Sequence, residues 1–340
     1  KMIFTQFWLL TILINCVGLF INVLLGIDYL SIQSGSALFD MVAYLYMLIL
    51  CFTFESVLTK LSYDEIWTLF KRIFYSAVLI VGTLFIVSRF RQTLFGISLF
   101  YEGVRFSPLA DNPHQINVLT STLPFIGFRI LKEDKSLRSK AVTSVFLAAN
   151  LLVSLSTRSD TMKVAYIVCF YLMLVIHERG SRQEKPSYFA AIFVSLIAFL
   201  GIVYSWDWFV GLVIRFFEEG DAGGVRFILW RNSVQAGMRS PIFGLGPGAH
   251  TGFYGPFEAV ESHQMLLTMF TQSGLIGVTV LMALVFKVVR TVYKDKHVFI
   301  MVVGLLISSL SGTMLRRTVW WIYMMICYHL VQRMNDRLPS

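Results

Sequence analysis

Arginine is the residue type in this chain best suited to hold a ligand. Ten arginines fall in the loops on one side of the alternating apolar segments, where Lys163 is the lone lysine. Arginine presents a planar fork that binds phosphate at two points, whereas lysine is a flexible point charge. The set therefore predicts a phosphate-bearing, anionic ligand on that side, although pairing with nearby acids remains the alternative for any single arginine. The ten are Arg89, Arg91, Arg105, Arg158, Arg215, Arg226, Arg231, Arg239, Arg316 and Arg317.

His263 is the residue whose position best suits proton transfer. It follows Ser262 at the start of an apolar segment, so we expect Ser262 to cap a helix whose first residue is His263. The positive end of a helix dipole disfavours protonation and would keep the imidazole neutral. A neutral imidazole can take a proton from a sugar hydroxyl. A hydrogen-bonding role without catalysis is the alternative, and no neighbouring residue favours His114 or His250 as a base.

Residues 205–262 form a polar, Gly-rich and aromatic interruption of an otherwise apolar chain. Within it, residues 221–224 predict a cap, followed by a helix that ends before Pro241. Arg226 and Trp230 are four residues apart, so they share one face of that helix, and we expect Trp230 to support the loop. This interruption is expected to carry the chemistry.

Three glycines follow the predicted helix. Gly244, Gly246 and Gly248 alternate with other residues in the segment 241–248, which also contains Pro241 and Pro247. Their spacing differs from a dinucleotide-binding fingerprint, and no βαβ unit surrounds them. They predict a tight loop over the membrane surface, which supports the site and lets the backbone come close to a ligand.

Metal and cofactor patterns are missing from the sequence. There is no HExxH, GxSxG or DxD pattern, and the four cysteines lie inside apolar segments as small core residues. We therefore expect no metal and no cofactor, with cationic side chains stabilising a leaving phosphate.

Composition predicts an all-α polytopic membrane protein. Of the 340 residues, 56% are hydrophobic and 14% are charged, against about 25% charged in soluble domains. The net charge of +9 lies mostly in short loops on one side, as the positive-inside rule requires, so it does not indicate nucleic acid. We expect an amphipathic surface piece at 55–70 and ten spans, at 2–25, 37–54, 73–88, 114–131, 141–156, 161–176, 187–204, 263–286, 298–313 and 319–331.

Loop charge predicts the topology. The lysine-rich loops belong in the cytoplasm, and an even number of spans places both termini there. The chain then divides into spans one to seven (1–204), a large periplasmic loop that carries the site (205–262) and spans eight to ten (263–340). Asp40 is one of few charges inside a span.

Four stretches of the chain resemble the O-antigen ligases and the Wzy-type polysaccharide polymerases of bacterial surface glycan assembly. Each matches a segment of that superfamily in order and in predicted placement, although Gln264 and His114 stand where asparagine is common. The four are Arg105 with Asp111-Asn-Pro-His-Gln115, Ser156-Thr-Arg-Ser159, Gly224-x-Arg226-x3-Trp230 with Pro241-x2-Gly244-x-Gly246-x-Gly248, and Ser262-His263-Gln264 with Gly274 and Gly277.

The resemblance implies an inverting, metal-independent glycosyltransferase of the GT-C type in the bacterial inner membrane. It implies up to twelve spans, an undecaprenyl-diphosphate-linked oligosaccharide as donor, membrane lipids as surroundings and a chain-length regulator protein as a further partner. By the same resemblance Arg158 and Arg226 hold the donor diphosphate, and His263 activates the acceptor hydroxyl. Arg105 and Arg316 are further donor-binding candidates, chosen for their placement.

Three functions remain open at this point. A polymerase moves the growing chain onto the next lipid-linked repeat unit, and we favour it. An O-antigen ligase moves the finished chain onto lipid A–core with the same residue roles. A transporter or flippase of a lipid-linked anion belongs to a different class, which places ionisable residues and broken helices near the membrane midplane.

Overall fold

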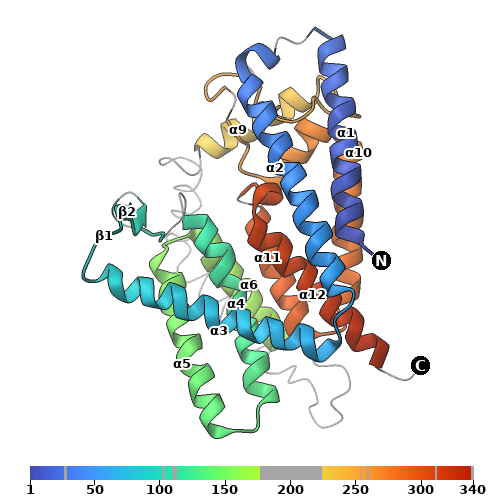
Figure 1. Cartoon of the computed structure of the whole chain (residues 1–340). Helices are drawn as coiled ribbons and strands as arrows, with labels where there is room; N and C mark the ends of the chain where they lie inside the picture. The colour runs from blue at the N-terminus through green and yellow to red at the C-terminus, as the bar shows by residue number, and fades with distance from the viewer. Residues whose placement is uncertain are drawn as a thin grey trace.

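The structure of the chain is a computed structural model, and it is mostly helical (Figure 1). It describes residues 1–26, 29–101, 103, 105–108, 113–176, 224–252, 254–258, 260–310 and 312–337. The helices are α1 (Ile3–Leu24), α2 (Tyr29–Leu58), α3 (Tyr63–Ser88), α4 (Pro113–Glu133), α5 (Leu137–Ser156), α6 (Asp160–Val175), α9 (Gly224–Gly237), α10 (Met265–Val292), α11 (Lys296–Ser309) and α12 (Thr318–Arg337), with the 3-10 turn η1 (Met314–Arg316) before α12. Two hairpins of two-residue strands, β1 (Thr93–Leu94) with β2 (Ile97–Ser98) and β3 (Phe100–Tyr101) with β4 (Arg105–Phe106), follow α3.

The predicted spans coincide with helices wherever the structure describes them. Nine of the ten do so, and the predicted span at 187–204 lies outside the described residues. Among the described residues, five helices are long and apolar enough to cross a bilayer, which confirms the coarse prediction of a helical membrane protein. They are Ile3–Leu24, Ala37–Leu58, Tyr63–Ser88, Leu137–Ser156 and Met265–Val292.

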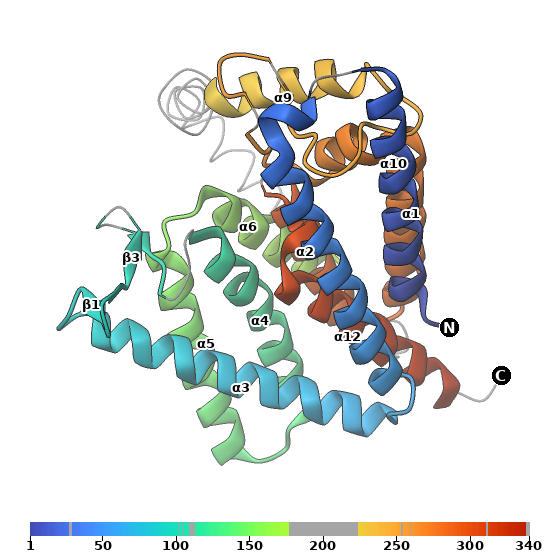
Figure 2. The same ribbon diagram turned by 45° about the horizontal axis from the view of Figure 1, so that its top comes forward.

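The predicted surface piece at 55–70 is wrong. α2 continues to Leu58, and α3 begins at Tyr63 after a short turn. Ser62 and Glu65 form a capping box, in which the Ser62 amide donates to Glu65 Oε2 at 2.8 Å and the Glu65 amide donates to Ser62 Oγ. The polar residues of this stretch are therefore turn and cap residues between two long helices. α3 then runs across α4 and α5 (Figures 1 and 2).

A buried acid joins three helix ends at the end of the bundle opposite the site. Glu55 of α2 accepts the backbone amides of Phe4 at 3.3 Å and Thr5 at 3.0 Å, so it caps α1 in place of a residue in the preceding turn. His329 of α12 lies 3.5 Å from the same carboxylate. The N-terminus and the last described turn of α12 lie near this end, at the right of Figure 1.

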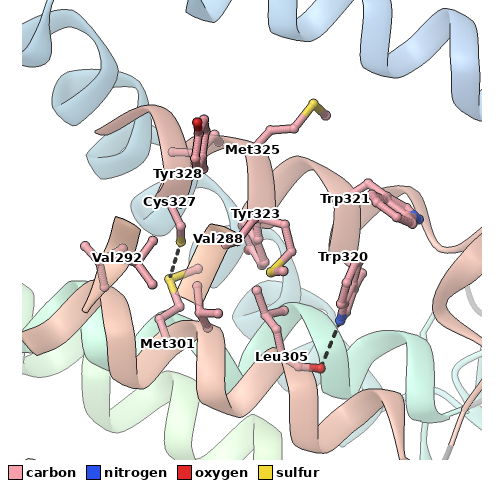
Figure 3. Packing of buried hydrophobic residues seen from close by; sticks show 14 of the residues in the cluster. Val288, Val292, Met301, Leu305, Trp320, Trp321, Tyr323, Met325, Cys327 and Tyr328 are labelled. Atoms are coloured by element: carbon pink, nitrogen blue, oxygen red, sulfur yellow. Dashed lines mark hydrogen bonds between the residues drawn. The ribbon is translucent and has the colours of Figure 1, made fainter. Parts of the chain in front are cut away.

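α12 is the central helix of the core. Its residues from Trp320 to Val331 are buried almost without interruption, and Figure 3 shows several of them packed against α10 and α11. The Trp320 indole donates to the Leu305 carbonyl at 2.9 Å, which fixes the helix next to α11. A helix that is apolar on all sides belongs in the interior, and η1, which contains Arg316, directly precedes this buried helix. Three cysteines are buried as predicted, but Cys16 on α1 is exposed, so its predicted core position is wrong.

Candidate functional site

The site is built around a break in α10. Gly274 has φ 61° and ψ −163°, which no helical residue adopts. The amides that the break frees are satisfied by the glycine loop, residues 241–248: Leu275 donates to the Pro241 carbonyl at 2.8 Å, and Ile276 donates to Ile242 at 3.2 Å. Irregular backbone inside a membrane protein persists only where such partners exist.

The glycine loop is tight, as predicted, but it lies deeper than predicted. Gly244, Gly246 and Gly248 all have positive φ, at 73°, 86° and 79°. A β-carbon on Gly246 would lie 2.7 Å from the amide nitrogen of Leu19, and one on Gly18 would lie 2.8 Å from the Gly246 nitrogen. The loop is therefore wedged between α1 and α10 and does not lie over the surface, because small residues on both sides allow close backbone approach.

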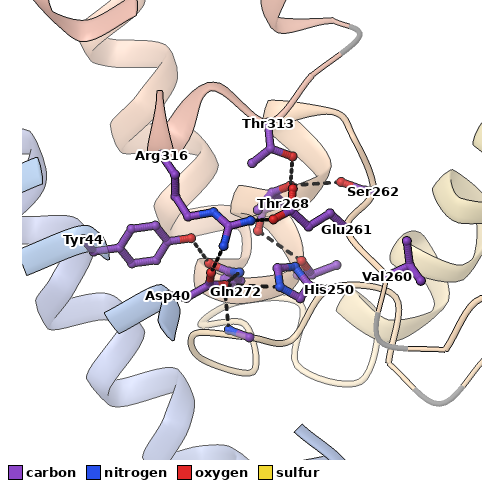
Figure 4. A network of polar contacts seen from close by, with 12 residues as sticks. Asp40, Tyr44, His250, Val260, Glu261, Ser262, Thr268, Gln272, Thr313 and Arg316 are labelled. Carbon is purple, nitrogen blue, oxygen red and sulfur yellow. Dashed lines mark hydrogen bonds and ion pairs between the residues drawn. The ribbon is translucent and has the colours of Figure 1, made fainter. Parts of the chain in front are cut away.

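Asp40 is the centre of a polar network under this loop (Figure 4). Its side chain is 1% exposed. One carboxylate oxygen accepts the Gln272 side-chain amide at 2.7 Å and the Gly248 backbone amide at 3.0 Å, while the other accepts Arg316 Nη1 at 2.7 Å. Tyr44 donates to the carbonyl oxygen of the Gln272 side chain. The acid thus ties α2 to the glycine loop, to the broken helix and to η1.

His250 belongs to the same network, although the sequence offered no reason to select it. Its Nε2 lies 3.4 Å from the Asp40 carboxylate. Burial lowers the pKa of His250, Asp40 opposes that effect, and Arg316 and His263 add to it. The imidazole is therefore neutral near pH 7. The signal that could have found it is Asp40 itself, because an acid inside a span needs a nearby polar partner.

Arg316 lies at the predicted end of the bundle but is already paired. Besides Asp40, its guanidinium binds the carboxylate of Glu261, and it lies over the Phe39 ring at 5.1 Å. For this arginine, pairing with acids is what the structure shows. Its role as a donor-binding residue remains a prediction.

His263 lies before the helix and not in its first turn. Gln264 is the cap of α10, and its side-chain oxygen accepts the Leu267 amide at 2.6 Å. The predicted Ser262 cap is therefore wrong, because the longer Gln264 side chain reaches the free amide. His263 instead adopts a positive φ of 51°.

Two side chains contact Ser262, the residue before His263, and so position the His263 backbone. Trp230, which we expected to support the loop, donates its indole N–H to the Ser262 carbonyl at 3.1 Å. The Ser262 hydroxyl lies 2.9 Å from the Thr268 hydroxyl in the first turn of α10. α9 and α10 pack side by side at this end of the bundle, as Figure 2 shows, so both helices position His263.

The electrostatics around His263 favour its neutral form. Burial lowers the pKa of His263 most, and the charges of Arg226 and Arg317 lower it further. The structure thus favours the neutral His263 that we predicted, but for a different reason. Burial and two guanidinium groups disfavour the protonated imidazole, and the predicted helix dipole is not among the causes. Arg317 is one of the ten arginines noted in the sequence but was not chosen as an individual site residue, because its side chain comes near His263 only through the fold.

A second group of arginines lies at the turn between α5 and α6. Arg158 has a positive φ of 52°, and its carbonyl accepts Arg105 Nη2 at 3.2 Å. Asn117 of α4 donates to the Ser159 hydroxyl at 3.0 Å and fixes the same turn. The two predicted donor-binding residues Arg105 and Arg158 are thus neighbours. The Asp-Asn pair at 111–112 and the predicted cap at 221–223 lie outside the described residues.

The arrangement combines one neutral imidazole with guanidinium groups on neighbouring segments. In the part of the chain that the structure describes, no three residues of the His, Cys, Asp and Glu types lie together as a metal site. A neutral base beside fixed positive charge can take a proton while a neighbouring anion is stabilised. Comparisons with protein-family models and with curated proteins find no match for this chain.

Proposed function

We propose that the protein is an inverting glycosyltransferase that polymerises undecaprenyl-diphosphate-linked repeat units at the outer face of a bacterial inner membrane. The observation that carries this proposal is a histidine, His263, whose backbone is positioned through Ser262 by Trp230 and Thr268, and whose pKa is lowered by burial and by the charges of Arg226 and Arg317. Glycosyl transfer from a diphosphate requires a base that takes the proton of the acceptor hydroxyl and positive charge that stabilises the leaving diphosphate. The resemblance of four stretches to the ligases and polymerases supplies the substrate class.

In the proposed reaction His263 accepts the proton of an acceptor sugar hydroxyl. The hydroxyl oxygen forms a bond to the anomeric carbon of the donor, and the bond from that carbon to the diphosphate oxygen breaks. The electron pair leaves with undecaprenyl diphosphate, whose charge Arg226 and Arg158 are proposed to stabilise as bidentate partners. Arg105 is proposed to orient Arg158 through its carbonyl.

The first test uses purified protein in detergent with undecaprenyl-diphosphate-linked repeat units alone. A ladder of longer glycans is expected, because each unit serves as donor and as acceptor. Transfer that begins only when lipid A–core is added would replace the polymerase with the ligase. Absence of transfer under both conditions would overturn the glycosyltransferase proposal.

The break in α10 favours a second candidate, transport of a lipid-linked anion. Broken helices and buried acids are typical of transporter binding sites, and Gly274 and Asp40 supply both. Reconstitution in liposomes with a labelled lipid-linked oligosaccharide tests it. Movement of the label between leaflets, without elongation of the glycan, would support the transporter.

A further inference from the structure

Arg316 lies between two carboxylates that differ in their surroundings. Asp40 is 1% exposed and also accepts the Gly248 amide and the Gln272 side chain. The side chain of Glu261 is 21% exposed, similar to the 20% of Arg316, and in the described part of the chain its ion pair is with Arg316. One carboxylate is thus built into the core, and the other lies at the rim.

The charges of this group do not balance. Two carboxylates share one guanidinium, and the remaining member of the network, His250, is kept neutral by burial. Asp40 alone neutralises Arg316, so Glu261 is not needed to balance that guanidinium. Glu261 lies two residues before His263, on which the charges of Arg226 and Arg317 act.

We propose that Glu261 occupies on Arg316 the position of a ligand phosphate group, and that a diphosphate displaces it on binding. This inference rests on the proposed function and names a further donor-binding contact of the same site. A guanidinium binds a carboxylate and a phosphate with the same fork geometry. The exchange can occur at this contact because the pair lies at the rim, with side chains 20% and 21% exposed, and an ion pair that water reaches is weaker than one in the core.

Asp40 has the opposite role in this arrangement. Breaking a buried ion pair is strongly destabilising, so Asp40 keeps Arg316 in place while Glu261 leaves. Release of Glu261 also frees the segment that ends at His263, so diphosphate binding and the position of the base are coupled.

The experiment measures binding of inorganic pyrophosphate to the purified full chain in detergent by isothermal titration calorimetry. Glu261→Gln removes the competing charge and is expected to bind pyrophosphate about five- to tenfold more tightly than the wild type. Glu258→Gln makes the same charge change at an exposed position of the same loop and is expected to stay within about twofold. Unchanged or weaker binding by Glu261→Gln, or equal gains in both variants, would overturn the inference.

A double variant without the Asp40–Arg316 pair distinguishes displacement of Glu261 from Arg316 from a general effect of removing one negative charge. In the double variant Asp40→Asn/Arg316→Gln no buried charge is left unpaired, and the added Glu261→Gln change is expected to give no gain. A gain that persists there would show that Glu261 acts on another group, against the inference.

The experiments distinguish failure of the proposed glycosyltransferase function from failure of the proposed displacement of Glu261. Transfer from a lipid-linked donor, together with no effect of Glu261→Gln on the binding of pyrophosphate or undecaprenyl diphosphate, would remove the displacement alone. Tighter binding in Glu261→Gln with no transfer to any acceptor would leave the displacement and remove the glycosyltransferase. No pyrophosphate binding by any variant would overturn the displacement, and the glycan ladder then decides the function.

Discussion

Asp40 and Arg316 are 276 residues apart in the chain, yet their side chains form an ion pair with 2.7 Å between Oδ1 and Nη1. The pair joins α2 to the turn that precedes the central helix α12. Because Asp40 also binds the glycine loop and Gln272, this contact connects four segments that the sequence keeps far apart.

Loss of the Asp40 charge is expected to destabilise the fold. Asp40→Asn leaves Arg316 without its buried partner, which costs about 3–5 kcal/mol when one member of such a pair is removed. Asp336→Asn breaks an ion pair with Arg333 whose acid is 61% exposed and is expected to change stability by less than about 1 kcal/mol. Thermal unfolding of both variants in detergent makes the comparison, and equal melting temperatures would contradict the role of Asp40.

Removal of the imidazole is expected to abolish transfer. His263→Ala should lower the rate by about 100- to 10,000-fold, the usual contribution of a general base. The fold should persist, since Ser262 and Gln264 keep their hydrogen bonds. Activity is measured as glycan transfer and integrity as the melting temperature. Full turnover by this variant would remove His263 from the mechanism.

Arginine geometry is expected to matter at residue 226. Arg226→Lys keeps the positive charge but loses the planar fork, so the KM for the lipid-linked donor should rise about tenfold or more. Arg231→Lys, at an exposed position on the same helix, is the matched control and should behave as the wild type. A donor KM for Arg226→Lys equal to that of the wild type would exclude bidentate binding there.

The pH dependence of transfer reports on His263. A base must be neutral to act, and burial, Arg226 and Arg317 lower the pKa of His263, so the acid limb of kcat/KM should lie below the usual histidine value of about 6.5. Arg317→Gln removes one of these charges, which lets the pKa rise and moves the acid limb to higher pH. An acid limb unchanged by Arg317→Gln would contradict the assignment.

The broken helix gives a steric prediction. Gly274→Ala places a methyl group against the Ile242 carbonyl at a positive φ, so it should prevent the glycine loop from docking and lower the melting temperature. Gly82→Ala in α3 meets open space and should be neutral or slightly stabilising, because alanine favours the helix. Similar melting temperatures for the two variants would show that the break tolerates a side chain.

The helices could be predicted from the sequence because apolar length determines them locally. The ends of the helices were harder to predict than their existence. The polar residues at 60–65 resemble one face of a surface helix, yet they form a turn and a capping box. Two caps compete at the start of α10, and the choice between Ser262 and Gln264 depends on packing against Trp230 and Thr268.

Several residues of the candidate site could be selected from the sequence, but the contacts between them could not. His263, Arg226 and the glycines have types and spacings that mark them locally. His250 has no such mark, and Arg317 is marked only as one of ten arginines, because what selects these two is proximity to Asp40 and to His263 in the folded chain. The depth of the glycine loop likewise follows from Gly18 on α1, more than 220 residues earlier, as the Asn22 contact to Leu245 at a separation of 223 residues shows.

The long separation of Asp40 and Arg316 has a consequence for biosynthesis. At translation rates of about 5–20 residues per second, the ribosome reaches Arg316 roughly 14–55 s after Asp40. During that time α2 carries a carboxyl group in the membrane without its guanidinium. A nascent chain interrupted before residue 316 therefore lacks the guanidinium that pairs with Asp40 in the finished protein, and its second helix carries an uncompensated carboxyl group.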